Sequence, residues 1–149
     1  MKNKFGFILV KTQLGENIGA CARSMKNFGF SKLHIVSPKI NFPNHKTKAT
    51  SVGAYDIINK AKVFDNVEKA IKPFNLVIAL SARRRDINKR HISLQNFQNI
   101  IKKRQNLNIG FMFGPEASGL SNQDLSFSNY IMQIPTSIKF KSLNLSHSL

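Results

Sequence analysis

Short apolar runs, each followed by a segment with helical periodicity, constrain this chain more than any other feature of its sequence. The runs Phe5 to Val10, Leu33 to Val36 and Leu76 to Leu80 have the length and composition of strands covered on both faces. Gly110 to Phe113 and Tyr130 to Ile134 continue the series. Strands that alternate with helices favour a parallel sheet. We therefore predict an α/β fold, with helices on both faces of a mostly parallel sheet.

The segments between the runs predict the helices. Apolar residues at helical spacing follow Asn17, a candidate N-cap, and Gly29 suits the end of that helix. Two further helices are expected at Ala54 to Ala61 and at Val67 to Ile71. The remaining expectations are a strand at Lys62 to Phe64, a basic loop at Lys39 to Lys48 broken by Pro43, and a helix opened by Ser93 with Leu94, Phe97 and Ile101 on one face.

The length of 149 residues suits one domain, and neither an internal repeat nor a linker divides it. We therefore expect a single domain over residues 1–149. No apolar run approaches the roughly 18–20 residues of a membrane span, and the basic N-terminus lacks the apolar stretch of a secretory signal. Cys21 is the single cysteine, which excludes an internal disulfide framework and favours the reducing cytoplasm. No Cys/His spacing indicates a metal site.

The charge balance points to a polyanionic partner. The chain carries 23 Lys and Arg against 7 Asp and Glu, a formal net charge of +16. Such a surplus favours nucleic acid first and an anionic membrane surface second. A general bias toward Lys and Asn would also raise the charge without any partner, so this feature needs support from the motifs.

Three loops stand where ligands bind in sheets of this kind, beyond the carboxyl ends of the strands. They are Ser81 to His91, Gly114 to Leu120 and Pro135 to Leu143, and Lys11 to Asn17 belongs to the same edge. The second loop contains two glycines, which permit close approach of the backbone to a ligand, and one carboxylate at Glu116. A plain strand-to-helix turn is the alternative. A phosphate loop is excluded, because the Gly-Lys-Ser/Thr ending is absent.

Cationic side chains gather at two places near this edge. The predicted helix after Asn17 presents Gly19, Arg23, Lys26 and Asn27 opposite its apolar stripe, and Arg23 is a candidate phosphate contact or a solvated arginine. Arg83, Arg84 and Arg85, with Lys89 and Arg90, form the densest basic cluster. This cluster is a candidate clamp for an RNA backbone, and a solvated loop is the alternative.

Three segments together resemble a known family. Asn17 to Gly29, Phe113 to Asn122, and Ile134-Pro135-Thr136 with Ser142 to Ser146 resemble, in order and spacing, the three motifs of the SPOUT-class (TrmH-type) RNA 2′-O-ribose methyltransferases. Val10-Lys11-Thr12 and Leu80 to Arg85 resemble the TrmJ branch of that class, whose members methylate nucleotide 32, a cytidine or uridine, in the tRNA anticodon loop. The resemblance covers essentially the whole chain.

The resemblance implies a deep trefoil knot, S-adenosyl-L-methionine as methyl donor, tRNA as substrate, and a homodimer with active sites at the subunit interface. Carried over by position, it implies catalytic roles for Arg23, Asn17, Glu116, Ser142 and Asn144. It implies a cofactor pocket formed by Leu80, Ser81, Ala82, Gly114, Ile134, Ser142 and Leu143. RNA contacts are expected from Arg23, Arg83, Arg84, Arg85, Lys89 and Arg90.

A guanidinium keeps its proton up to a pKa of about 12 or beyond, so Arg23 is a poor general base. We expect Arg23 to hold the phosphate beside the target ribose and to stabilise the developing oxyanion, while that phosphate or Ser142 relays the proton. The chain ends at Leu149, within the helix that follows the third motif in the family, so we expect a C-terminally incomplete domain. An inactive fragment, a non-enzymatic basic RNA-binding remnant, and the same chemistry on ribosomal RNA are the alternatives.

Overall fold

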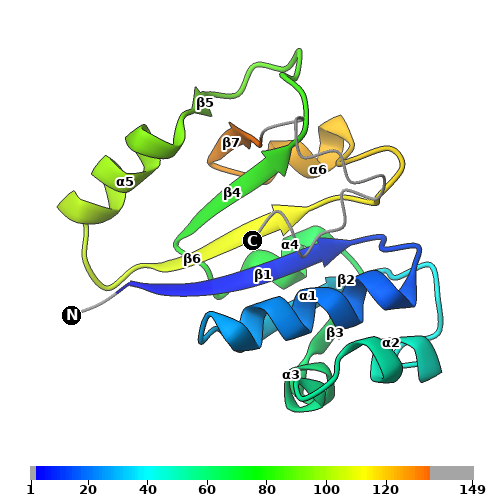
Figure 1. Cartoon of the computed structure of the whole chain (residues 1–149). Coiled ribbons are helices and arrows are strands. Elements are labelled where there is room, and N and C mark those ends of the chain that lie inside the picture. The colour runs from blue at the N-terminus through cyan, green and yellow to red at the C-terminus, as the bar shows by residue number, and fades with distance from the viewer. Residues whose placement is uncertain (1–2, 135–149) are drawn as a thin grey trace.

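A single parallel sheet organises the molecule, as the computed structural model, which describes residues 3–134, shows (Figure 1). Its seven strands follow the order β3-β2-β1-β6-β4-β7-β5, and every neighbouring pair is parallel. The strands are β1 (Lys4–Val10), β2 (Lys32–Val36), β3 (Lys62–Phe64), β4 (Leu76–Ser81), β5 (His91–Ile92), β6 (Asn108–Phe113) and β7 (Tyr130–Gln133). The helices are α1 (Gly15–Asn27), α2 (His45–Thr50), α3 (Tyr55–Lys60), α4 (Val67–Ile71), α5 (Leu94–Lys103) and α6 (Asn122–Ser126).

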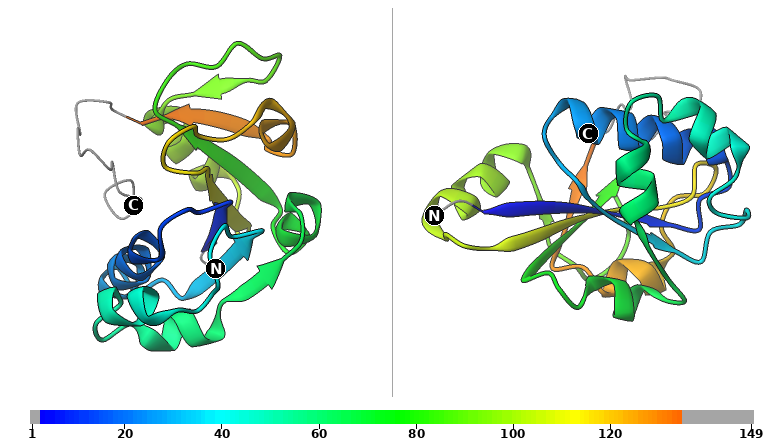
Figure 2. Two further views of the ribbon diagram at one scale, coloured as in Figure 1. Left: turned by 90° about the vertical axis from the view of Figure 1, so that its right-hand side faces the viewer. Right: turned by 90° about the horizontal axis from the view of Figure 1, so that it is seen from below.

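Helices cover both faces of the sheet, which confirms the predicted fold class (Figure 2). Successive side chains of a strand point to opposite faces. Phe7 and Leu9 of β1 therefore pack with α1, α3 and α5, whereas Ile8 and Val10 pack with α4 and α6. Both faces of β1 are buried, and this burial explains why the strand is apolar at consecutive positions.

The register brings the carboxyl ends of the central strands to one edge. β1 pairs with β6 through Leu9 and Phe113, and β4 pairs with β7 through Ser81 and Gln133. The segments after β1, β4, β6 and β7 consequently meet at that edge. The amide of Ile134 donates to the carbonyl of Ser81 over 2.8 Å and continues this pairing by one residue beyond β7.

The predicted basic loop at Lys39 to Lys48 is wrong in its second half, because α2 begins there at His45. Asn44 caps α2 and accepts hydrogen bonds from the amides of Lys46 and Thr47, each over 3.0 Å. The Thr47 hydroxyl accepts in return from the Asn44 amide, over 2.9 Å. This reciprocal capping box is a local signal that Pro43 and the surrounding charges obscured.

The first helix also begins earlier than predicted. Leu14, not Asn17, occupies the N-cap position, and Asn17 is buried in the first turn of α1. Gly19 does not lie on the exposed face, because α2 packs directly against it and a Cβ at Gly19 would overlap Thr50. The predicted end of the helix is confirmed, since Gly29 has a φ of 80°.

Three smaller expectations are also corrected. Leu94 and Phe97 line the same apolar cavity, as expected of residues on one face of α5, but only Phe97 is buried and Leu94 is 61% exposed. His91, predicted as part of a loop, pairs with Ile131 in the short strand β5. α6 was not predicted at all, although Ser121 caps it by accepting from the amide of Asp124 over 3.0 Å. The predicted knot and the loop Pro135 to Leu143 lie outside the described residues.

Candidate functional site

A cavity of about 280 Å³ opens where β4 and β6 end, at the carboxyl edge of the sheet. Five of the residues predicted to bind the cofactor line it together: Leu80, Ser81, Ala82, Gly114 and Ile134. They come from three segments that are distant in the sequence, and parallel pairing of the strands brings them together. Ser142 and Leu143, the other two predicted cofactor residues, lie outside the described residues.

The wall formed by the end of β4 is held by local hydrogen bonds. All six residues of this strand are buried, so the chain emerges from a rigid part of the core. The Ser81 hydroxyl then donates to the carbonyl of Arg83 over 2.7 Å and accepts from the Arg83 amide over 3.3 Å. These bonds shape the start of the β4–β5 loop, residues 82–90, directly beside the cavity.

The opposite wall is the β6–α6 loop, residues 114–121, which folds back on its own start. A Cβ at Gly114 would overlap the backbone of Gly119 and Leu120, so only glycine fits there. Gly119 has a φ of 73°, and its amide donates to the carbonyl of Pro115 over 2.9 Å. The two glycines of the motif are therefore needed for the tight path of the loop, beyond what a plain strand-to-helix turn requires.

Polar atoms without partners gather on the side of this loop that faces β1. The backbone amide of Gln13 donates to Oε2 of Glu116 over 3.1 Å, which joins the segment after β1 to the β6–α6 loop. Within residues 3–134, three buried side-chain atoms lack a hydrogen-bond partner: Thr12 Oγ1, Asn17 Nδ2 and Glu116 Oε1. Buried polar groups are nearly always hydrogen-bonded. The three atoms belong to the segment after β1, the first turn of α1 and the β6–α6 loop, and the bond from Gln13 to Glu116 joins the first of these segments to the last.

Of the five predicted catalytic residues, Glu116 lines the cavity from the β6–α6 loop, and Asn17 is buried in the first turn of α1. Thr12 was not predicted as a site residue. Its position two residues after the buried strand β1, in the segment Lys11 to Asn17 that was already expected at the ligand-binding edge, was the available signal. Ser142 and Asn144 lie outside the described residues.

Arg23 is exposed on α1 and does not line the cavity. It stands six residues after Asn17, which corresponds to about 9 Å along the helix axis. Its neighbour Lys26 is bound to Asp56 by an exposed ion pair of 2.9 Å, whereas no ion pair involves Arg23 within the described part of the chain. The Arg23 guanidinium is thus available to an external anion.

The basic cluster divides into exposed and buried members. Arg83 and Arg84 are exposed, and the Arg90 guanidinium lies 5.9 Å from the centre of the Tyr130 ring. Lys89 donates to the carbonyl of Ser126 over 3.1 Å. Arg85 is buried, and burial together with the nearby charge of Arg83 lowers the pKa of its guanidinium.

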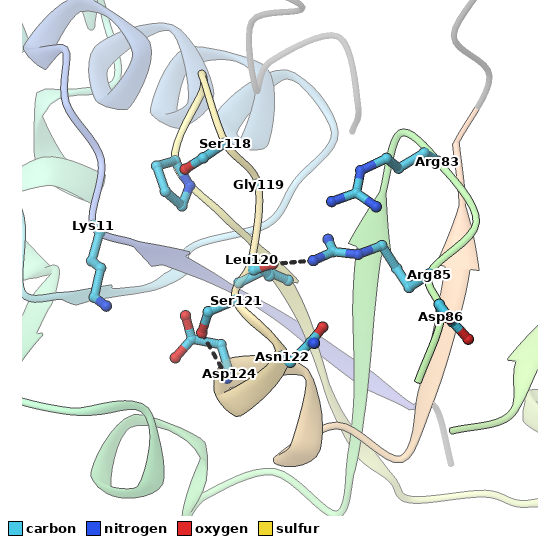
Figure 3. A pocket seen from close by; sticks show the side chains of 11 residues that line it. Lys11, Arg83, Arg85, Asp86, Ser118, Gly119, Leu120, Ser121, Asn122 and Asp124 are labelled. Atoms are coloured by element: carbon cyan, nitrogen blue, oxygen red, sulfur yellow. Dashed lines mark hydrogen bonds between the residues drawn. The ribbon is translucent and has the colours of Figure 1, made fainter. Parts of the chain in front are cut away.

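A second cavity, of about 430 Å³, lies on the other side of the β6–α6 loop (Figure 3). Lys11 approaches it from the end of β1, and Arg83 and Arg85 approach it from the β4–β5 loop. Asp86 and Asp124 also line it, so its charge is mixed. Among the described residues, no group of three or more His, Cys, Asp or Glu side chains is arranged to hold a metal ion, and no helix is long and apolar enough to cross a membrane.

A parallel sheet whose post-strand loops enclose a cavity at the carboxyl edge defines an α/β domain that binds a small ligand there. The family model described as the SpoU rRNA Methylase family matches residues 4–149. The chain therefore belongs to the SpoU rRNA Methylase family.

Individual relatives agree with this assignment. The tRNA (cytidine/uridine-2′-O-)-methyltransferase TrmJ of Photorhabdus laumondii is 33% identical over 146 residues, which are 97% of this chain and 60% of that protein. The crystal structure of TrmJ from Z. mobilis superposes with a TM-score of 0.85 at 34% identity, over 96% of this chain and 64% of that one. The chain thus spans less than two thirds of the length of either relative.

A structure with lower sequence identity shares the fold. The SpoU methyltransferase AviRb from Streptomyces viridochromogenes, solved in complex with the cofactor AdoMet (S-adenosylmethionine), superposes with a TM-score of 0.71. The match covers 99% of this chain and 56% of AviRb at 14% identity, so it shows a shared fold.

Proposed function

We propose that this chain is an S-adenosylmethionine-dependent tRNA 2′-O-ribose methyltransferase that acts on the pyrimidine at nucleotide 32 of the anticodon loop. The observation that carries the proposal is the cavity at the carboxyl edge of the sheet, lined by Leu80, Ser81, Ala82, Gly114 and Ile134. Membership of the SpoU family and the likeness to TrmJ proteins support the reaction class. The surplus of 23 cations over 7 anions supports an RNA substrate.

The cavity fits S-adenosylmethionine in its chemistry. Leu80, Phe113 and Ile134 offer apolar surface for an adenine ring. Arg83, which also lines the cavity, offers a positive charge for the carboxylate of the amino-acid end. When bound, the cofactor supplies an electrophilic methyl group on a sulfonium. The small residues around the cavity, among them Ser81, Ala82 and Gly114, would leave room for it.

The residues on the β1 side of the β6–α6 loop would serve the RNA. Asn17 Nδ2 can donate a hydrogen bond, Glu116 Oε1 can accept one, and the Thr12 hydroxyl can do either. This set complements a ribose, whose hydroxyls also donate and accept. Arg23 would hold the phosphate beside that ribose and stabilise the oxyanion, while the phosphate or Ser142 relays the proton.

Methyl transfer to bulk tRNA from S-adenosylmethionine with a labelled methyl group tests the proposal, followed by mapping of the modified ribose. We expect label at nucleotide 32 and a loss of about 100-fold in the single-turnover rate of Arg23→Ala. A wild-type rate in Arg23→Ala would remove its assigned role. If calorimetry detects no binding at millimolar S-adenosylmethionine, the chain is an inactive fragment or an RNA-binding remnant.

Ribosomal RNA is the second candidate substrate, and the description of the matching family favours it. The same chemistry would apply, with a different RNA around the same ribose. Parallel assays on tRNA and on ribosomal RNA fragments separate the two, because the substrate that carries the label after ribose mapping is the one the chain methylates.

We further propose that the chain acts in the cytoplasm as a homodimer. The resemblance to the SPOUT class supports the dimer, and the lone buried cysteine is compatible with a reducing compartment. Light scattering coupled to size-exclusion chromatography measures the oligomeric state directly. A molar mass of one 16.8 kDa chain at micromolar concentration would contradict the dimer.

A further inference from the structure

Arg85 differs from the two arginines that precede it. As a whole residue it is only 8% exposed, while Arg83 and Arg84 are exposed. Its Nη2 donates to the carbonyl of Leu120 over 2.6 Å, and its backbone amide donates to Nε2 of His91 over 3.2 Å. None of the ion pairs within residues 3–134 involves Arg85. Its buried charge is therefore directed at a backbone carbonyl and not at a carboxylate.

The bond from Arg85 joins two loops that are distant in the sequence. Arg85 belongs to the β4–β5 loop, and Leu120 lies in the β6–α6 loop, 35 residues away in the sequence. Figure 3 shows the guanidinium reaching from one loop to the other, with Arg83 extended beside it. Arg85 lines both the cofactor cavity and the second cavity, as do Arg83 and Gly119, so the two cavities adjoin at this contact.

Burial makes this bond strong and its loss costly. A buried cation is unfavourable unless hydrogen bonds compensate for its lost hydration, and bonds from a charged donor are roughly twice as strong as neutral ones. Removal of the guanidinium would also leave the buried carbonyl of Leu120 without this donor. An RNA phosphate would have to compete with that carbonyl, whereas Arg83 and Arg84 are free to meet it.

We infer that Arg85 is a positioning residue: it fastens the β6–α6 loop to the β4–β5 loop and thereby keeps the cofactor cavity in shape. The identity of the ligand in this inference rests on the proposed function. The contact between the loops does not, because it is a property of the chain without ligand.

The experiment compares the full chain with Arg85→Ala, Arg85→Lys, Arg84→Ala and the matched control Arg104→Ala, which removes an exposed arginine at the end of α5. Calorimetry measures the dissociation constant for S-adenosylmethionine, filter binding measures affinity for tRNA, and hydrogen exchange follows the amides of residues 119–121. Thermal unfolding shows that each variant is folded.

For Arg85→Ala we expect cofactor affinity to fall about tenfold or more, with faster exchange at residues 119–121 and tRNA affinity within about twofold of wild type. Arg85→Lys should recover most of the cofactor affinity, since an ammonium can donate to the same carbonyl. Arg84→Ala should weaken tRNA binding alone, and Arg104→Ala should change neither.

Unchanged cofactor affinity and unchanged exchange in Arg85→Ala would overturn the inference, and so would a selective loss of tRNA affinity. If the wild type binds no S-adenosylmethionine, the proposed function fails, and the exchange data still decide whether Arg85 fastens the loop. If Arg85→Ala does not fold, Arg85→Lys with its exchange pattern decides the question: partly raised exchange supports the inference, and wild-type exchange with tenfold weaker cofactor binding contradicts it.

Discussion

The two sides of the β6–α6 loop differ in how completely their polar groups are satisfied. On the side of the β4–β5 loop, Arg85 bonds to Leu120 and Ser81 bonds to Arg83. On the side of β1, Thr12 Oγ1, Asn17 Nδ2 and Glu116 Oε1 lack partners within the described residues. A satisfied network holds a shape, whereas unsatisfied buried groups are costly until a ligand meets them. Under the proposed function, the bonded side shapes the cofactor cavity, and the unbonded atoms of the β1 side would meet the RNA.

Gly114→Ala disturbs the hydrogen-bonded side of the β6–α6 loop and should have the largest effect on affinity for the cofactor. Its new methyl group would overlap the backbone of Gly119 and Leu120, which cannot move aside as a flexible side chain can. We expect affinity for S-adenosylmethionine, measured by calorimetry, to fall by about two orders of magnitude, equivalent to about 3 kcal/mol.

Gly53→Ala is the control for Gly114→Ala. Gly53 has a φ of 78° but open space around it, so alanine there introduces backbone strain of about 1 kcal/mol without overlap. It should lower the melting temperature slightly and leave cofactor affinity unchanged. An equal loss of affinity in both variants would show that general destabilisation, and not the path of the loop, controls binding.

Thr12→Val and Thr47→Val compare the loss of an unbonded hydroxyl with the loss of a bonded one. Both threonines are fully buried, and the change in side-chain shape is small. The Thr47 hydroxyl is bonded to both the amide and the carbonyl of Asn44, so its removal should cost about 1–3 kcal/mol of unfolding free energy. The Thr12 hydroxyl has no partner among residues 3–134, so its removal should leave stability equal or up to about 1 kcal/mol higher.

The same Thr12→Val variant should lose about tenfold in kcat/KM for tRNA if the hydroxyl meets the substrate. Denaturant unfolding and methyl-transfer kinetics on the same samples provide both numbers. A Thr12→Val protein that is destabilised as much as Thr47→Val would show that the β1 side is satisfied after all, and the contrast between the two sides would disappear.

Acid should destabilise the core through His34. His34 is buried, and burial lowers its pKa from 6.5, with a smaller contribution from the charges of Lys32 and Lys62, although its Nδ1 lies 2.8 Å from the carbonyl of Ala70. The unfolded chain therefore binds a proton more readily than the folded one. The contribution of neutral His34 to the free energy of unfolding is complete above pH 6.5, and it is lost as the pH drops toward and through the folded-state pKa.

Melting temperatures at pH 7.5 and 5.5 measure this acid sensitivity. The drop should shrink in His34→Gln and persist in His45→Gln, which changes an exposed histidine. If both variants keep the full drop, His34 is not its source.

The smallest expected effect is the absence of a reaction at Cys21. Complete burial raises the pKa of its thiol to about 12, so almost no reactive thiolate exists near neutral pH. We expect an aromatic disulfide reagent at pH 8 to label the unfolded chain readily and the folded chain only as fast as it unfolds. Rapid labelling of the folded chain would indicate that α1 opens locally, which would also loosen Asn17 on the unsatisfied side.

Periodicity and spacing predicted most of the fold, because the signals involved are local. Continuous apolar runs identified β1, β2, β4, β6 and β7, and their burial on two faces is the physical reason. The elements that the sequence did not predict are short. α2 and α6 contain six and five residues, so their capping residues Asn44 and Ser121 were the main signals available.

For the site, the strand order predicted that the loops beginning at Ser81 and Gly114 meet at one edge. The resemblance to the SPOUT class then implied that Leu80, Ala82 and Ile134 belong to the same pocket. It could not distinguish Arg83, Arg84 and Arg85, which are chemically identical neighbours. Only the tertiary structure decided that Arg85 is buried against Leu120 and that the Thr12 hydroxyl is buried without a partner in the part of the chain that the structure describes. Burial and hydrogen bonding depend on segments brought together from across the chain, whereas strand and helix propensities depend on neighbours in sequence.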